Sequence, residues 1–173
     1  AIAAHMAAHV AYTRAPISAQ ELNQAQMSLI GLLEDARVEY NAVRELPGLK
    51  PLWRALHAAP REGRPEHEAV GWLESLALAL LDATQRTGGA DLDALALKFH
   101  ANVEASRLDN AISWHLGLEL HNLLVARRAL PSLRVLESLR IPYRDDNRYV
   151  WEFEEFSWQR GVDLLRGEKQ VRK

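Results

Sequence analysis

The chain has 173 residues, of which 48% are hydrophobic and 25% charged, with no cysteine and a formal net charge of −2. This composition is typical of one folded globular protein; it excludes disulfides and thiolate metal sites, and disfavours a disordered tail or a nucleic-acid binder that works through bulk positive charge. No segment has the roughly 18 uncharged apolar residues of a membrane span, and no signal peptide is recognisable, so we expect a cytoplasmic protein.

The first third of the chain has helical patterns. An alanine-rich helix is predicted over 1–14. Ser18, with Glu21 three positions later, has the form of a capping box and predicts a long helix from there to about Leu46. A short helix is predicted over 51–58. The apolar residues of the long helix are spaced by three and four and share one face: Leu22, Ala25, Leu29, Leu32, Ala36, Tyr40 and Val43.

The helical pattern continues after a polar loop. One helix is predicted to end at Gly88–Gly89, and the next to begin with Asp91 as its N-cap. Asp109 is expected to cap a helix over 111–130 that is apolar on nearly every side. We therefore place this helix at the centre of the bundle, together with the apolar face of the long helix. A last short helix is expected over 132–140.

The C-terminal residues differ in composition. Six of the twelve aromatic residues lie between Tyr143 and Trp158, interleaved with acidic side chains. The pattern near 148–154 fits a short extended segment as well as a helix, and 161–173 fits an amphipathic helix. The sequence therefore predicts an all-α protein: an irregular, monomeric bundle of six to eight helices over 1–141. Residues 142–173 then pack on it or lead to a further domain.

Two histidines and several carboxylates form the candidate polar site. His5 and His9 are one helical turn apart, a spacing that suits a pair of metal ligands. The glutamate that follows the first histidine in zinc proteases is Met6 here, and no third histidine follows in register. We therefore expect a structural polar network and no metal, because a half-buried carboxylate needs a partner. The expected members are His5, His9, Glu34, Asp35, Arg37 and Glu39; a metal site of His5, His9 and Glu39 is the alternative.

The aromatic C-terminal segment is the candidate interface. No nucleophile elbow, glycine-rich phosphate loop or Ser/His/Asp spacing is present, so we expect no enzymatic activity. Tyr, Trp and Arg are the side chains that most often anchor protein interfaces. The candidate partner-binding residues are Tyr143, Arg144, Asp145, Asp146, Arg148, Tyr149 and Trp151. The alternative is that this segment packs back onto the bundle, since aromatic side chains dominate cores as well.

Four segments taken together resemble a known family. They are Ala4–His9 (AHMAAH), Leu32–Glu39 (LLEDARVE), Leu46–Trp53 (LPGLKPLW) and Ile141–Trp151 (IPYRDDNRYVW). Their order and number are similar to the N-terminal helical region of von Willebrand factor A proteins of the type associated with nitric oxide reductase activation or Rubisco activation. The region 60–139 matches only in helical character.

The resemblance implies a non-catalytic interaction module of an adaptor that works with a MoxR-type AAA+ ATPase to activate or mature a client enzyme, nitric oxide reductase or Rubisco. In that family the von Willebrand A domain binds a divalent metal through an Asp-x-Ser-x-Ser motif, which this sequence lacks. We therefore expect no cofactor within this chain. Because the chain starts without methionine, we expect that domain to lie beyond Lys173 in a longer protein. The alternatives are a purely structural domain and a metal-dependent, hydrolase-like helical domain that uses His5, His9 and a carboxylate.

Overall fold

The computed structural model describes residues 1–57, 67–137, 139, 141, 143–144 and 150–152. In this part of the chain there are seven helices and two short strands, which confirms the predicted all-α bundle. None of the described helices is both long and apolar enough to cross a membrane. The elements in chain order are α1 (Ile2–Tyr12), β1 (Ile17–Ser18), α2 (Gln24–Glu45), α3 (Leu49–His57), α4 (Glu68–Leu81), α5 (Ala90–Ser106), α6 (Ala111–Ala126), α7 (Leu133–Leu136) and β2 (Trp151–Glu152).

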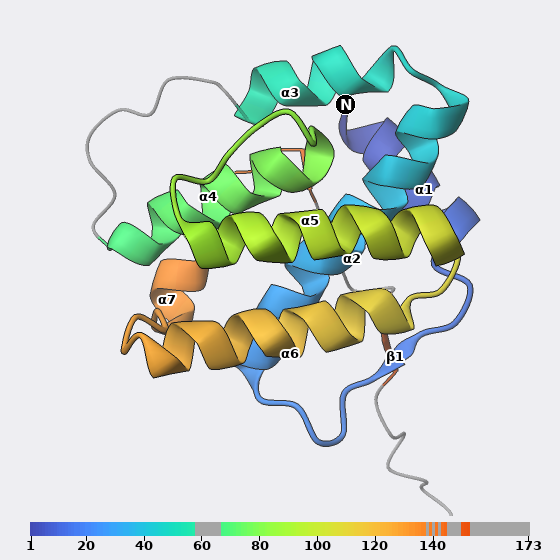
Figure 1. Cartoon of the computed structure of the whole chain (residues 1–173). Helices are drawn as coiled ribbons and strands as arrows, with labels where there is room; N and C mark the ends of the chain where they lie inside the picture. Colours follow the sequence, from blue (N-terminus) through green and yellow to red (C-terminus); the bar gives the residue numbers. More distant parts are fainter. Residues whose placement is uncertain (58–66, 138, 140, 142, 145–149, 153–173) are drawn as a thin grey trace, which may run out of the picture.

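Helix α2 is the centre of the bundle. It packs against α1, α3, α4, α6 and α7, and every residue from Leu29 to Glu39 is buried. In Figure 1, α5 and α6 lie side by side across the front, with α2 behind them. The main apolar core lies between α2, α4, α5 and α6, and includes Leu33, Leu76, Phe99 and Leu120.

Helix α6 is not at the centre, so this part of the sequence prediction is wrong. Its exposed side includes Val125, which is 48% exposed. The pattern is apolar on nearly every side because α6 has two apolar neighbours. One is the main core; the other is a small cluster in which Trp114 and Leu118 pack against Ile17 and Ile30. The buried apolar side chains of α6 form one face: Ile112, Leu116, Leu120 and Leu124.

The start of α2 also differs from the prediction. The side chain of Asn23 accepts a hydrogen bond from the backbone N–H of Gln26, and the side chain of Gln26 accepts one from the N–H of Asn23, both at 2.9 Å. This is a capping box of the kind predicted for Ser18 and Glu21, but it lies farther along the chain. Ser18 is not a cap because no helix follows it directly: it belongs to β1, and α2 begins only at Gln24.

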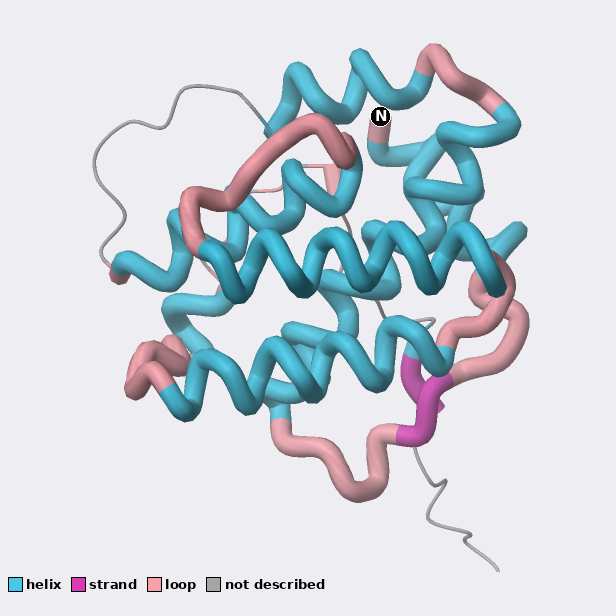
Figure 2. The backbone as a smooth tube through the Cα atoms, in the orientation of Figure 1, coloured by secondary structure: helices cyan, strands magenta, loops and turns pink. Residues whose placement is uncertain are grey.

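Strands β1 and β2 pair in parallel, with Ile17 opposite Trp151 and Ser18 opposite Glu152. Figure 2 shows the two short strands beside each other at one edge of the bundle. Of the two structures that the pattern near 148–154 fits, the extended one is found at Trp151–Glu152. The predicted C-terminal helix over 161–173 lies outside the described residues.

Helix α4 ends at Leu81, before the predicted stop at Gly88–Gly89. The carboxylate of Asp82 accepts hydrogen bonds from the backbone N–H and the hydroxyl of Thr84, at 3.2 and 2.9 Å. It also pairs with Lys50 at 2.9 Å and Arg54 at 3.4 Å. An aspartate that bonds the backbone two residues later favours a turn over a further helical turn, so Asp82 ends the helix.

Candidate functional site

A group of buried, ionisable side chains lies where α1 packs on α2. His5 and His9 are one turn apart on the inner face of α1, and Asp35 and Glu39 are one turn apart on α2. Each of the four is at most 4% exposed. Together with Arg144, which contacts both carboxylates, they are referred to below as the polar cluster.

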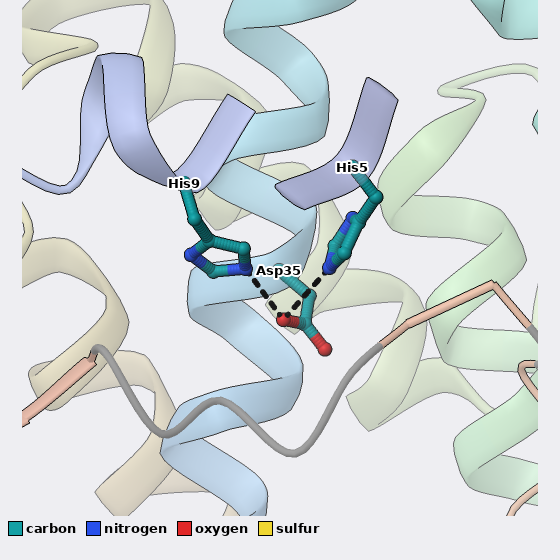
Figure 3. A group of neighbouring side chains, drawn as sticks. All are labelled: His5, His9 and Asp35. Carbon is teal, nitrogen blue, oxygen red and sulfur yellow. Dashed lines mark hydrogen bonds and ion pairs between the residues drawn. The ribbon is translucent and has the colours of Figure 1, made fainter. Parts of the chain in front are cut away.

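The two imidazoles converge on one carboxylate oxygen. The Nε2 atoms of His9 and His5 lie 3.1 and 3.5 Å from Oδ1 of Asp35, and Figure 3 shows both rings directed at this atom. The Nδ1 of His5 lies 3.2 Å from Oε1 of Glu39. The three residues whose potential ligand atoms lie within 4.8 Å of one another are therefore His5, His9 and Asp35. The alternative set predicted from the sequence had Glu39 in the place of Asp35.

Arg144 brings a positive charge into the cluster from the segment after α7. Its Nε and Nη2 atoms donate to the two carboxylate oxygens of Glu39 at 2.8 and 2.9 Å. Its Nη1 lies 3.6 Å from Oδ2 of Asp35. A bidentate pair of this kind fixes the geometry as well as the charge. Because Arg144 approaches Oδ2, the Oδ1 atom of Asp35 faces the histidines.

A second set of hydrogen bonds extends the cluster beyond His9. The Nδ1 of His9 lies 3.1 Å from the hydroxyl of Thr13, which donates to Oε1 of Glu34 at 2.8 Å. Glu34 also accepts from the hydroxyl of Ser113 on α6, at 2.7 Å, and from the guanidinium of Arg37. All six members of the network predicted from the sequence are thus joined by one continuous series of contacts. Thr13 and Ser113 were not predicted. Thr13 follows His9 by four residues, a spacing that could have indicated it, whereas Ser113 is 79 positions from Glu34 along the chain and no local spacing relates the two.

Aromatic rings cover the cluster on the side of α3. The rings of Trp53 and Tyr143 stack with 5.7 Å between their centroids, and the ring of His5 packs edge-on against both. The hydroxyl of Tyr143 lies 2.7 Å from Nε2 of His57, within hydrogen-bond distance. These contacts keep water away from His5, whose side chain has no exposed surface.

The candidate partner-binding residues fall into three groups. Tyr143 is 1% exposed and the side chain of Arg144 5% exposed, so both are interior residues and the packing alternative describes them. Trp151 is half-buried in β2. The other four lie outside the described residues: Asp145, Asp146, Arg148 and Tyr149.

The charges of the cluster shift the pKa values of its members. Burial would lower the pKa of His5, but the contacts with Asp35 and Glu39 outweigh burial and raise it to about 9. Burial would raise the pKa of both carboxyls, but Arg144 and the histidines hold the pKa of Asp35 and of Glu39 below the ordinary values. Burial, together with the charge of Arg144, lowers the pKa of His57 to about 4.

The opposite face of α1 is apolar and exposed. Ile2, Met6 and Val10 follow one another at intervals of four and are 54%, 43% and 84% exposed. Helix α1 therefore directs its histidines inward and its apolar side chains outward, the reverse of an ordinary surface helix. This face was not predicted, although the lack of any charged residue in α1 is a signal for it. The exposed face of α1 consists of Ile2, Ala3, Met6, Ala7, Val10 and Ala11.

Comparison with known proteins gives no match: no family model, no curated protein and no solved structure matches this chain. Function must therefore be argued from the described residues and from the resemblance of the four segments. Two features have the burial and chemistry to support such an argument. They are the buried polar cluster and the exposed face of α1.

Proposed function

We propose that this chain is a non-catalytic helical interaction module of an adaptor protein that works with a MoxR-type AAA+ ATPase. In this proposal the ATPase provides the energy of ATP hydrolysis, and the helical module provides a surface that the ATPase binds. The adaptor directs that energy to a client enzyme that needs activation or maturation. The resemblance implies nitric oxide reductase or Rubisco as the client.

The segments that resemble the family lie together in space, which supports the proposal. Each of the four contributes a side chain to the polar cluster or to its aromatic cover: His5, Asp35, Trp53 and Arg144. Residues that are scattered along the sequence but meet at one site are more specific than any one of the segments alone. Because the four segments meet at one site, we treat them as a single motif of the family that they resemble.

The exposed face of α1 is the observation on which the docking role depends. Apolar side chains at intervals of three or four on one helix face are the anchors by which a helix binds an apolar groove. Ile2, Met6 and Val10 have this spacing and are exposed. The face contains no charge, so we expect the ATPase to offer an apolar groove rather than a charged patch. The buried histidines fix α1 on the bundle, which reduces the entropy lost on binding.

Aspartate substitutions in this face test the docking role. Met6→Asp and Val10→Asp each put a charge on the exposed face and leave the buried side of α1 unchanged. We expect the affinity for a purified MoxR-type ATPase to fall at least about tenfold, because a central apolar anchor of an interface typically contributes about 2 kcal/mol or more and about 1.4 kcal/mol is a factor of ten. The measurements are calorimetric titration of the purified ATPase and its rate of ATP hydrolysis.

Leu97→Asp is the matched control. Leu97 is an exposed apolar residue of α5, 60% exposed, and is not part of the exposed face of α1. We expect this variant to bind the ATPase like the wild type, and all three variants to keep the wild-type melting temperature. Wild-type affinity in both Met6→Asp and Val10→Asp would show that α1 is not the docking helix. A wild-type chain that neither binds nor stimulates the ATPase would favour a purely structural domain.

A further inference from the structure

The polar cluster supports a second and independent inference. We propose that His5, His9 and Asp35 form a structural binding site for a divalent first-row transition ion of the Zn²⁺ type. The ligand atoms are the two Nε2 atoms and Oδ1 of Asp35. This proposal departs from the expectation that the chain holds no metal, and it puts Asp35, not Glu39, in the ligand set.

The distances from Oδ1 of Asp35 to the two imidazole nitrogens fit such an ion. Nitrogen and oxygen ligands lie about 2.0–2.2 Å from Zn²⁺, so two ligands of a tetrahedral site are separated by roughly 3.3–3.6 Å. Oδ1 of Asp35 lies 3.1 Å from Nε2 of His9 and 3.5 Å from Nε2 of His5. All three atoms lie within 4.8 Å of one another. Small rotations of the two imidazoles therefore suffice to place all three atoms around one ion (Figure 3).

The hydrogen-bond donors and acceptors around the rings favour a cation between them. The hydroxyl of Thr13 gives its proton to Glu34, so it accepts from Nδ1–H of His9. The Nδ1 of His5 faces Oε1 of Glu39, which is also an acceptor. With one proton on each Nδ1, both Nε2 atoms direct lone pairs at Oδ1 of Asp35. The repulsion between these lone pairs and Oδ1 is removed either by a proton on each Nε2 or by one divalent ion between the three atoms. Both add two positive charges.

The Nδ1 atoms of His5 and His9 have the kind of contact that orients an imidazole on a metal. A metal-bound histidine almost always directs its second nitrogen at a carboxylate, a carbonyl or water, which fixes the tautomer and the ring. Glu39 lies in this position beside His5, and the hydroxyl of Thr13 lies there beside His9. In addition, neither nitrogen of His5 has a partner in good hydrogen-bond geometry, although the residue is 0% exposed. A buried polar group in that state is rare and calls for an explanation. A bound ion would be the partner of Nε2, the nitrogen that faces Asp35.

The burial of the ligands indicates a structural ion rather than a catalytic one. The side chains of His5, His9 and Asp35 are at most 5% exposed. A catalytic zinc has three protein ligands and keeps its fourth position open to substrate. The three ligands here leave a fourth position too, but because they are buried, an enclosed water would fill it and no substrate would reach the ion. An ion at this point would join α1 to α2 directly beneath the exposed face of α1.

Metal binding is tested on the untagged 173-residue protein, stripped with a chelator and then dialysed against Zn²⁺. We expect one Zn²⁺ per chain by elemental analysis and a higher melting temperature with Zn²⁺ than without it. With Co²⁺ as the probe we expect the strong visible absorption of a four-coordinate ion with imidazole ligands. His5→Gln and His9→Gln should lose the ion, whereas His115→Gln should keep it, because His115 is an exposed histidine of α6.

The outcomes separate this inference from the docking role. Less than stoichiometric Zn²⁺ in the loaded wild type, or full Zn²⁺ content in the folded double variant His5→Gln/His9→Gln, would overturn the metal site. If those variants fail to fold, the Co²⁺ spectrum of the wild type decides: a spectrum of hexaaqua ions alone overturns the site as well. Neither result alters the test of the docking role, since Met6 and Val10 lie on the opposite face of α1.

Discussion

Arg37 is a fully buried side chain that connects three helices. Its guanidinium donates to both carboxylate oxygens of Glu34, at 2.8 and 2.6 Å. It also donates to the backbone carbonyls of Tyr12 and Arg107, at 2.9 and 2.8 Å. These two residues lie at the C-terminal ends of α1 and α5, where helices leave carbonyl groups without an internal partner. Arg37 therefore ties the ends of both helices to α2.

Replacing Arg37 with lysine should destabilise the protein although the charge is kept. An ammonium group has three donors on one atom and cannot reproduce the planar fork that reaches all four acceptors. We expect Arg37→Lys to reduce the free energy of unfolding by about 3 kcal/mol, the usual cost of disrupting a buried pair. Arg127→Lys is the control, because Arg127 pairs with Asp91 on the surface; we expect a change within about 0.5 kcal/mol. The free energy of unfolding is measured by urea denaturation. Equal decreases in Arg37→Lys and Arg127→Lys would contradict this role of Arg37.

Some of the polar cluster was predictable from single residues and some was not. The spacing of four between His5 and His9, and between Asp35 and Glu39, places each pair on one helix face. Which carboxylate both histidines share depends on how α1 lies on α2, and no local pattern reports that. Arg144 is 105 positions from Glu39 along the chain, so its contact could not be inferred from spacing.

At the scale of elements, apolar content was a poor guide to which helix is central. Helix α2 has Glu34, Asp35, Arg37 and Glu39 within its buried stretch, a pattern that normally marks a face in water. That face is covered because α1 and Arg144 supply partners for its charges. Helix α6 is more apolar than α2, but one of its sides is exposed at the surface of the bundle. Burial thus depends on whether polar groups find partners, which the sequence pattern alone does not show.

The close packing of α6 on α2 gives a prediction for Gly117. A Cβ atom at this position would lie 2.6 Å from both Cα and Cγ1 of Ile30. Alanine is normally better than glycine in a helix by about 1 kcal/mol. Here we expect Gly117→Ala to destabilise by about 2 kcal/mol, since overpacking of a core typically costs about 1–3 kcal/mol and the overlap is with backbone.

Gly48→Ala is the control for this prediction, because a Cβ at Gly48 meets nothing within 4 Å. Its effect on the denaturation midpoint should be small. A Gly117→Ala variant that is as stable as the wild type, or more so, would show that α6 and α2 are farther apart than the structure has them.

At the scale of the whole molecule, the polar cluster joins parts of the chain that are remote in sequence. It contains α1 from the beginning of the chain, α2 from the centre, and Arg144 from the segment after α7. Trp53 of α3 and Tyr143 cover it. Removal of one charge would leave others buried without a partner, which is costly. The cluster therefore couples the position of α1, and with it the exposed face of α1, to the integrity of the whole bundle.

His57 should make the stability of the whole protein dependent on pH. It lies against the hydroxyl of Tyr143 and faces the charges of Arg144 and Glu39. Its pKa falls from the ordinary 6.5 to about 4 on folding, through burial and the charge of Arg144. Between these two pH values the unfolded chain binds a proton that the folded chain does not. The contribution of His57 to the free energy of unfolding is therefore complete above pH 6.5 and is lost as the pH falls towards 4.

We therefore expect the melting temperature of the wild type to fall between pH 6.5 and pH 4, and to fall less in His57→Gln. Glutamine does not titrate and keeps an acceptor for the hydroxyl of Tyr143. His115→Gln, at the exposed histidine of α6, should follow the wild type. Asp35 and Glu39 have lowered pKa values, so they add a further loss at the acid end in all three proteins. If His57→Gln had the wild-type slope over the whole range, the acid loss would come from these carboxyls and not from the burial of His57.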